Sequence, residues 1–313
     1  MRVLGVLGYY PPSRRVGAFL ATHRFLAHLA ARGHDVTVVT GAVTAGCEVL
    51  DGVTIRRLDP ADAHALAGAA DVVVSHFGDD LRASRSALAF GRPMVRMVHA
   101  FPAGGSFGPR PALAVFVSEA QRQAFDEIPC GSIVAYPPTD PAEHRASPGD
   151  RITLVNLADA KGGGLFMRLA REMHDRQFLG VKGGYGDQNN PESSNVEVIA
   201  TTQNMRDDVW SRTRVLLMPS ACETWGMTGV EAMCSGIPVI AHPTPGLKES
   251  LGSAGIFVDR NDPRGWVDAI RRLDDPEVYA AASARALARV DELLPEIQAG
   301  LDRFADAVEA LCP

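Results

Sequence analysis

Short apolar runs alternate with helix-like segments along almost the whole chain, and this alternation limits the fold more than any other feature. Between two early runs, apolar residues recur at helical spacing from Phe19 to Ala30, and Gly33 is placed to end that helix. Such alternation predicts an α/β fold with a mostly parallel sheet covered by helices on both faces. The strands predicted in the first half are Val3–Leu7, Val36–Thr40, Val53–Leu58, Asp71–Ser75, Pro93–Val98 and Leu113–Ser118.

The same alternation returns after a proline-rich interruption. Residues 136–150 hold four prolines and show no periodicity, which predicts a linker between two domains. The strands predicted beyond it are Ile152–Val155, Phe178–Val181, Val196–Ala200, Val215–Met218, Pro238–Ala241 and Ile256–Val258. We therefore expect two doubly wound, Rossmann-like domains, residues 1–140 and 151–285, joined by the linker 141–150 and facing a central cleft. The tail from Val278 to Cys312 is predicted to be helical and broken at Pro295.

Composition excludes several classes of protein. A net charge of -6 argues against non-specific binding of nucleic acid, which relies on a basic surface. Apolar runs stay well short of the roughly 20 residues that span a bilayer, and Met1 leads directly into the first predicted strand, so we expect no transmembrane segment and no signal peptide. The five cysteines are scattered, which favours neither a disulfide framework nor a zinc site and suggests a cytoplasmic protein.

The most informative motif is P-S-A-C-E-T-W-G-M-T-G-V-E-A-M-C-S-G-I-P, residues 219–238, which follows a predicted buried strand. A helix is expected to begin near Gly226 and to end at Ser235-Gly236. The amino end of a helix at the carboxyl edge of a sheet suits a phosphate. Glu231 would lie roughly 7.5 Å along the helix axis, about the span from a nucleotide's distal phosphate to its ribose hydroxyls. Glu223, in the loop before the helix, would face whatever is attached beyond the phosphate.

This motif resembles the signature of the family 4 retaining glycosyltransferases, which have the GT-B fold. The resemblance implies that Glu231 binds the ribose of a nucleotide sugar and that Glu223 lies beside the donor sugar. It also implies that backbone N–H groups between the two glutamates hold the diphosphate, and that a C-terminal helix, residues 286–313, crosses back to the first domain. The residues between the glutamates that enter this prediction are Trp225, Gly226, Met227 and Thr228.

A second element of the predicted site is the segment V-N-L-A-D-A-K-G-G-G, which follows the first strand of the second domain. Lys161 and Gly162 can bring a positive charge and closely approaching backbone to the same diphosphate. The segment resembles the family's Lys-Gly element, whose lysine neutralises the departing diphosphate. Asn156 occupies a place where many family members have arginine, so phosphate binding would depend more on Lys161 and the helix dipole. In isolation, a surface lysine beside a flexible turn would explain the segment as well.

In the first domain, Gly17 opens the first predicted helix, where the family has a glycine-rich loop that approaches the donor phosphate. A glycine needed only for the turn into the helix is the alternative. Arg14 and Arg15 precede it and suggest either an anionic acceptor, a donor phosphate or a solvated basic turn.

Two histidines end neighbouring predicted strands of the first domain. His99 matches a family histidine near the donor sugar, and His76 holds the analogous place on the preceding strand, although a histidine at a strand end often only caps or packs. In the second domain, loops with Gly184 and Thr202 correspond to loops that flank the base in the family. Trp225 could pack beneath the sugar or fill the core.

These residues together predict a metal-independent, retaining glycosyltransferase. It would move a hexosyl unit from a nucleotide-diphosphate sugar, with UDP as the first choice, to a small-molecule, lipid or saccharide acceptor. Lys161 and the helix N–H groups would stabilise the leaving diphosphate, Glu223 would orient the sugar, and His99 would act near the reacting centre. No cofactor besides the nucleotide sugar is expected, and the oligomeric state stays open. The alternatives are a GT-B epimerase or a glycogen-synthase-like polymerase, and a sugar-nucleotide-binding protein or scaffold without activity.

Overall fold

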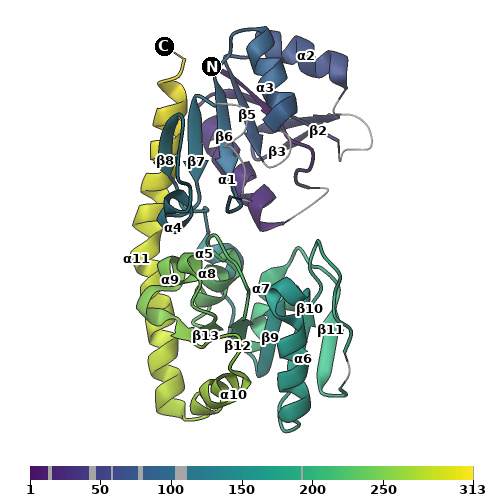
Figure 1. The fold of residues 1–313 in the computed structure, drawn as a ribbon, viewed down its shortest axis with the longest axis vertical. Helices are drawn as coiled ribbons and strands as arrows, with labels where there is room; N and C mark the ends of the chain where they lie inside the picture. The colour runs from purple at the N-terminus through teal and green to yellow at the C-terminus, as the bar shows by residue number, and fades with distance from the viewer. Residues whose placement is uncertain are drawn as a thin grey trace. The chain divides into compact units, whose positions relative to one another are not determined.

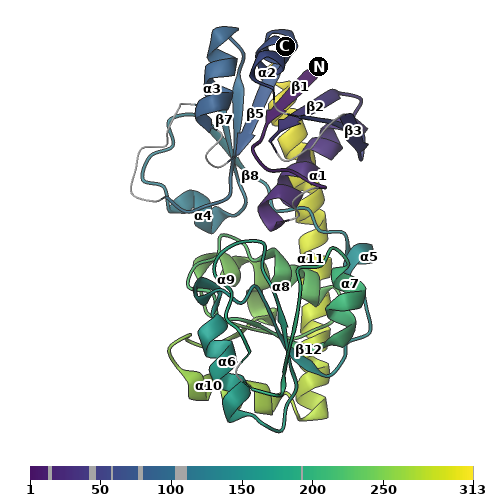
Figure 2. The same cartoon turned by 90° about the vertical axis from the view of Figure 1, so that its right-hand side faces the viewer.

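The computed structural model describes residues 1–12, 16–41, 47–57, 59–76, 80–102, 111–191 and 193–312. The chain forms two compact units (Figures 1 and 2): Met1–Pro138 with Glu296–Pro313, and Thr139–Pro295. Arg14, Arg15 and the predicted strand end at Leu58 lie outside the described residues.

The first unit is built on an eight-stranded sheet in the part of the chain described, with the order β3-β4-β2-β1-β5-β6-β7-β8. Neighbouring strands are parallel except β3 and β4, which form an antiparallel hairpin at an edge of the sheet. Chain order runs outward in both directions from β1 and β5, so the switch point of this sheet lies between them. The strands are β1 Arg2–Val6, β2 Asp35–Thr40, β3 Cys47–Leu50, β4 Val53–Arg57, β5 Val72–His76, β6 Met94–Val98, β7 Leu113–Phe116 and β8 Gly131–Val134.

Helices cover both faces of this sheet, as the sequence predicts. On one face, Phe25, Leu26 and Leu29 of α1 pack in a buried cluster with Val72 and Val74 of β5. On the other face, Val73 packs with buried alanines of α2 and α3. Because successive strand residues serve opposite faces and both faces are covered, the central strands are continuous valine-rich runs. The helices are α1 Gly17–Ala31, α2 Pro60–Ala69, α3 Asp80–Ala89 and α4 Glu119–Gln123.

The second unit has a six-stranded, parallel sheet in its described part, with the order β11-β10-β9-β12-β13-β14. Its switch point lies between β9 and β12, and residues of β12 again alternate between two clusters, Val215 and Leu217 in one and Leu216 and Met218 in the other. The strands are β9 Arg151–Val155, β10 Phe178–Val181, β11 Val196–Ile199, β12 Thr213–Met218, β13 Val239–Ala241 and β14 Ile256–Phe257. The helices are α5 Pro141–His144, α6 Gly163–Glu172, α7 Met205–Asp208, α8 Met227–Met233, α9 Pro245–Leu251 and α10 Pro263–Arg272, with short 3-10 turns η2 Asp159–Lys161, η3 Trp210–Arg212 and η4 Gly252–Ala254.

The C-terminal helix differs from the prediction, because α11 runs without a break from Pro276 to Glu309 and contains Pro295. Proline removes one N–H group and disfavours a helix interior. Here the residues on either side are held by separate cores: Val290 is buried in the second unit, and Phe304 and Val308 are buried in the first. Packing on both sides outweighs the local cost of Pro295, so the expected break is wrong.

The proline-rich segment after Pro138 is ordered in the second unit. Asp140 caps α5 by accepting a hydrogen bond from the Ala142 N–H, and the Ser235 hydroxyl donates to the His144 carbonyl at 2.8 Å.

None of the helices in the described ranges has both the length and the apolar character that crossing a bilayer requires.

Candidate functional site

The carboxyl ends of β9 and β12 lie at the switch point of the second sheet, where ligands bind in open α/β sheets. The loop after β9 contains η2 and ends at Gly162, and the loop after β12 runs from Pro219 to Gly226. The Ala221 N–H donates to the Ala160 carbonyl at 2.9 Å, which joins the two loops. The structure thus brings together the two segments that the sequence singled out.

Lys161 and Glu223 form an ion pair between these loops, in which Lys161 Nζ donates to Glu223 Oε1. The Ser220 hydroxyl donates to the same carboxylate oxygen at 3.0 Å. The side chains of Lys161 and Glu223 are 19% and 14% exposed, so the pair is only partly open to solvent. Both residues were predicted; Ser220, which holds the carboxylate in place, was not.

The charge of Lys161 is secured by its surroundings. Burial alone lowers the pKa of this ammonium, but the Glu223 carboxylate and the Tyr185 hydroxyl outweigh burial, and the pKa of Lys161 is raised above its usual value. Lys161 therefore carries a full positive charge at neutral pH.

Gly162 allows the two loops to approach each other. Its φ of +92° lies in the left-handed region, and a Cβ atom built there would come within 2.2 Å of Pro219 Cγ. Any other residue would be strained and would push Pro219 away. The glycine after Lys161 is thus explained by its left-handed backbone and by the close approach of the Pro219 ring to it.

The helix predicted to start near Gly226 is α8, Met227–Met233. Gly226 precedes it with a φ of +83°, and Gly236 ends the segment with a φ of +66°, the left-handed stop that the sequence predicts. The first N–H groups of a helix have no carbonyl partner within it, so those of Met227 and Thr228 are available in principle for an anion. Glu231 lies in α8 and is partly exposed. The side chain of Trp225 is 1% exposed and fills the core, so only its backbone can reach a ligand.

Gln188 ties the β9 loop to the loop after β10, and sequence reasoning missed it. Its Oε1 accepts from the Leu157 and Gly183 N–H groups at 2.9 and 2.8 Å. Its Nε2 donates to Asn156 Oδ1 at 2.9 Å and lies within 3.0 Å of the Tyr185 and Gly186 carbonyl oxygens. No local signal distinguishes such a glutamine from a solvated one, because its partners come from two separate loops.

Asn156 has a structural role in this arrangement. Its φ of +71° is in the left-handed region, which asparagine tolerates better than most residues. Its Oδ1 accepts from the Ala158 N–H at 3.1 Å as well as from Gln188. The residue itself is 7% exposed. The backbone conformation and these contacts explain an asparagine here without a contact to phosphate.

The two loops predicted to flank the base differ in how exposed their predicted contact residues, Gly184 and Thr202, are. The Thr202 hydroxyl donates to Asp208 Oδ2 and accepts from the Asn204 N–H at 3.0 Å, so it serves the turn that leads into α7. Gly184 is exposed in the loop that also carries Tyr185. Any contact of Thr202 with a ligand would have to come from its backbone or from a rearranged side chain.

In the first unit, His76 and His99 meet at the hydroxyl of Thr22 on α1. Thr22 Oγ1 lies 2.8 Å from His99 Nε2 and 3.3 Å from His76 Nδ1, and the two rings are 6.0 Å apart. Burial, with a smaller contribution from His76, lowers the pKa of His99 to about 3. Burial also lowers the pKa of His76 to about 4, against a hydrogen bond to the Tyr9 backbone. Both rings are therefore neutral at pH 7.

Gly17 is the first residue of α1 and follows the N-cap Val16.

Comparison with known proteins adds to this geometry. Residues 159–275 match the family model described as Glycosyl transferases group 1, a segment that includes Lys161, Glu223 and Glu231. The chain is 37% identical over 78 residues to the D-inositol 3-phosphate glycosyltransferase of Corynebacterium urealyticum, covering 24% of this chain and 18% of that protein. It is 39% identical over 82 residues to D-inositol 3-phosphate glycosyltransferase 1 of Catenulispora acidiphila, covering 25% and 20%. The matched segments thus span about a fifth of these relatives.

Solved structures match the chain over nearly its full length. The complex of Anabaena Alr3699/HepE with UDP-glucose has a TM-score of 0.83 at 15% identity, covering 99% of this chain and 100% of that one. Sucrose-phosphate synthase from Thermosynechococcus elongatus has a TM-score of 0.76 at 14% identity, with 99% of both chains covered. These likenesses show the fold. The chain has the GT-B fold of two Rossmann-like, parallel-sheet domains, which confirms the predicted fold class, and its second unit is similar to group 1 glycosyl transferases.

Proposed function

We propose that the protein is a metal-independent, retaining glycosyltransferase of family 4 that uses a nucleotide-diphosphate sugar. The observation that carries the proposal is the meeting of Lys161 and Glu223 at the switch point of the second sheet, with Glu231 on the helix that follows. This meeting supports a donor site because it joins a partly buried cation to a carboxylate that can accept from sugar hydroxyls.

Each group at the edge of the second sheet has a proposed role in holding the donor. Lys161 and the first N–H groups of α8 would bind the diphosphate. Glu231, about 7.5 Å along the helix axis from Gly226, would accept from the ribose hydroxyls. Glu223 would accept from hydroxyls of the donor sugar. The exposed loop of Gly184 and the backbone at Thr202 would flank the base, and UDP is our choice because the Anabaena neighbour is a complex with UDP-glucose.

The reaction would depend on electrostatic stabilisation of the leaving group. As the bond between the anomeric carbon and the phosphate oxygen breaks, negative charge grows on the diphosphate, and Lys161 faces that charge in a partly desolvated site. Glu223 would orient the sugar and would not attack it. For retention, a phosphate oxygen of the leaving diphosphate would accept the acceptor's proton on the face where the new bond forms. His99, neutral at pH 7, stays a proposed catalytic residue.

The Lys161–Glu223 ion pair also suggests how the donor would engage. A diphosphate at Lys161 would compete with Glu223 for hydrogen bonds from the ammonium group. Once the phosphate holds Lys161, Glu223 Oε1 becomes available to a sugar hydroxyl while Ser220 keeps the carboxylate in place. The ion pair would thus keep the side chains of Lys161 and Glu223 in position before the donor binds.

The proposal is tested by calorimetry and by product release. UDP-, GDP- and dTDP-glucose would be titrated into the purified protein, and the UDP released would then be followed with small-molecule, lipid and saccharide acceptors. Lys161→Ala and Glu231→Gln should abolish binding or transfer. Lys248→Ala and Glu277→Gln, which change exposed residues of the same types in the same unit, should leave both unchanged. Normal transfer by Lys161→Ala or Glu231→Gln would disprove the proposed site, and binding without turnover would identify a sugar-nucleotide-binding protein instead.

A further inference from the structure

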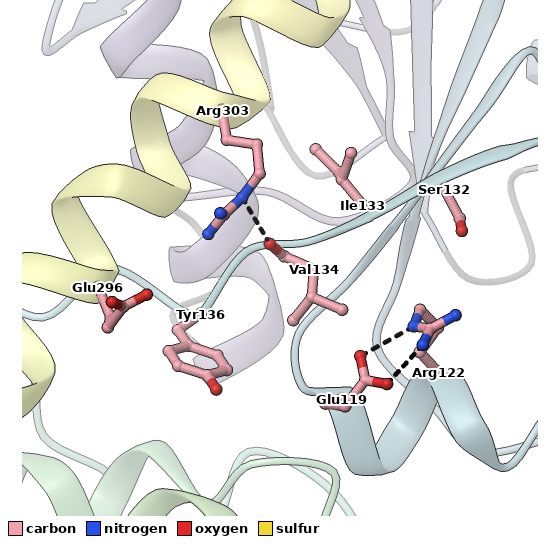
Figure 3. Close-up of a pocket in the computed structure, with 8 residues that line it drawn as sticks. All are labelled: Glu119, Arg122, Ser132, Ile133, Val134, Tyr136, Glu296 and Arg303. Atoms are coloured by element: carbon pink, nitrogen blue, oxygen red, sulfur yellow. Dashed lines mark hydrogen bonds and ion pairs between the residues drawn. The ribbon is translucent and has the colours of Figure 1, made fainter.

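A separate pocket of ≈ 390 Å³ lies in the first unit, beside the outer strand β8 (Figure 3). Its walls come from α4, from β8 and the residues after it, and from the last part of α11, all of which belong to that unit. The volume falls within the roughly 300–1,000 Å³ of small-molecule sites. Nothing in the proposed donor site uses these residues.

The strand edge at this pocket is already partly occupied. The Ala135 N–H donates to the Phe116 carbonyl toward β7, so Ser132 and Val134 direct their backbone groups to the opposite side, away from the sheet. There, Arg303 Nε donates to the Val134 carbonyl at 3.2 Å, as Figure 3 shows. An added peptide strand would need that carbonyl, whereas a small ligand can bind the backbone and hydroxyl of Ser132 without it.

The charges of the pocket balance. Arg122 and Glu119 of α4 form a two-pronged ion pair with Arg122 Nε 2.8 Å from Glu119 Oε2, and the hydrogen bond from Arg122 holds the pKa of Glu119 below its usual value. Arg303 and Glu296 of α11 add one charge of each sign. A phosphate would meet two carboxylates and a metal ion would meet two guanidinium groups. The lining therefore suits a neutral ligand.

The pocket lining has both hydrogen-bond donors and acceptors, so it favours a ligand whose groups can both donate and accept. Arginine only donates and an ionised carboxylate only accepts, while a hydroxyl does both. Tyr136 lines the same pocket (Figure 3), and the electron-rich face of its ring suits the C–H face of a sugar ring. We propose that this pocket binds a neutral saccharide unit, held by Arg303 and Ser132 as donors, by Glu296 as acceptor and by Tyr136 as a platform.

The proposal does not depend on the proposed transfer reaction, because a saccharide can bind at β8 whether or not the second unit uses a nucleotide sugar. Its test is saturation-transfer NMR on the full chain without nucleotide, with maltose, cellobiose, sucrose and trehalose as probes. At least one disaccharide should receive saturation, and inorganic phosphate should not displace it.

Two variants separate binding from folding. Glu296→Ala removes an exposed acceptor on α11 and should weaken binding about tenfold, the order expected for one hydrogen bond to a charged group. Arg303→Lys keeps the charge but loses the planar donor set, and should weaken it as well. Glu277→Ala, on the same helix but outside the pocket, should change nothing. The proposal is overturned if no disaccharide receives saturation, if phosphate competes, or if Glu296→Ala binds as the wild type does.

Discussion

Lys161 and Glu223, 62 positions apart in the sequence, share one ion pair at the carboxyl edge of the second sheet, and Ser220 donates to the same carboxylate oxygen. In the proposed site, Glu223 and a phosphate of the donor would compete for hydrogen bonds from the same ammonium group of Lys161. Removal of the Glu223 charge should therefore strengthen binding of the nucleotide and weaken orientation of the sugar.

Glu223→Gln should separate these two effects. Without the competing carboxylate, the protein should bind UDP up to about fivefold more tightly, as for an exchange worth about 1 kcal/mol. Transfer from UDP-glucose should fall about 10²-fold, the order that loss of substrate orientation produces. Calorimetry with UDP and a UDP-release assay would measure both. Weaker UDP binding in Glu223→Gln would contradict the competition between Glu223 and phosphate.

His76, which is buried, and His99, which is partly buried, predict how stability depends on pH. Folding holds the pKa of His99 at about 3 and that of His76 at about 4, below the ordinary 6.5. Between these values and pH 6.5 the unfolded chain binds more protons, so stability falls as the pH falls, by at most about 1.4 kcal/mol per pH unit for each histidine.

Urea unfolding of the wild type and of His99→Gln, measured from pH 7 to pH 4, would check this dependence. The variant should lose less stability than the wild type over that range, because one of the two groups is gone. His174→Gln, an exposed histidine of the second unit, is the control. Parallel pH profiles for wild type and His99→Gln would show that His99 is not held neutral by the fold.

Gln188 should control donor binding through loop position. Gln188→Ala removes bonds to Leu157, Gly183 and Asn156, and should raise the KM for the donor about tenfold with a smaller effect on kcat, at a cost of about 1–3 kcal/mol in unfolding free energy. Gln188→Glu should be worse, because a carboxylate oxygen would then face acceptors at Asn156 and Tyr185. Gln203→Ala, an exposed glutamine of the same unit, should behave as the wild type. An unchanged KM in both Gln188 variants would remove the glutamine from the site.

The fold could largely be predicted from the sequence because the central strands are buried on both faces. Val72–His76 is buried at every position and begins with three consecutive valines, which is an unambiguous strand signal. The outer strands β3 and β8 were not predicted, because their residues are mostly exposed or half-buried and leave no apolar pattern. The break expected at Pro295 failed for a related reason: local propensity was outweighed by burial on both sides of the proline.

The candidate site also has a part that could be predicted from the sequence and a part that could not. Lys161 and Glu223 could be predicted to meet, since both follow strands whose carboxyl ends share one edge. The clamp formed by Gln188 could not, because it depends on which backbone groups two loops bring within reach of one amide. Asn156 was predicted as part of the nucleotide-sugar site from its place in the sequence, but its left-handed backbone and its bonds to Ala158 and Gln188 depend on the folded geometry and could not be predicted.

The run Gly162-Gly-Gly164 offers a matched pair of substitutions within three residues. Gly162→Ala places a Cβ atom at a φ of +92° and 2.2 Å from Pro219 Cγ. Left-handed strain and overpacking each cost about 1–3 kcal/mol, so this variant should lose about 2–6 kcal/mol of unfolding free energy and should also lose donor binding. Gly164→Ala places a Cβ atom at an ordinary 3.4 Å from Asp159 Oδ1, inside α6, and should gain up to about 1 kcal/mol. Urea unfolding would measure both, and equal losses in the two variants would contradict the strain and the overlap with Pro219 expected for a side chain at position 162.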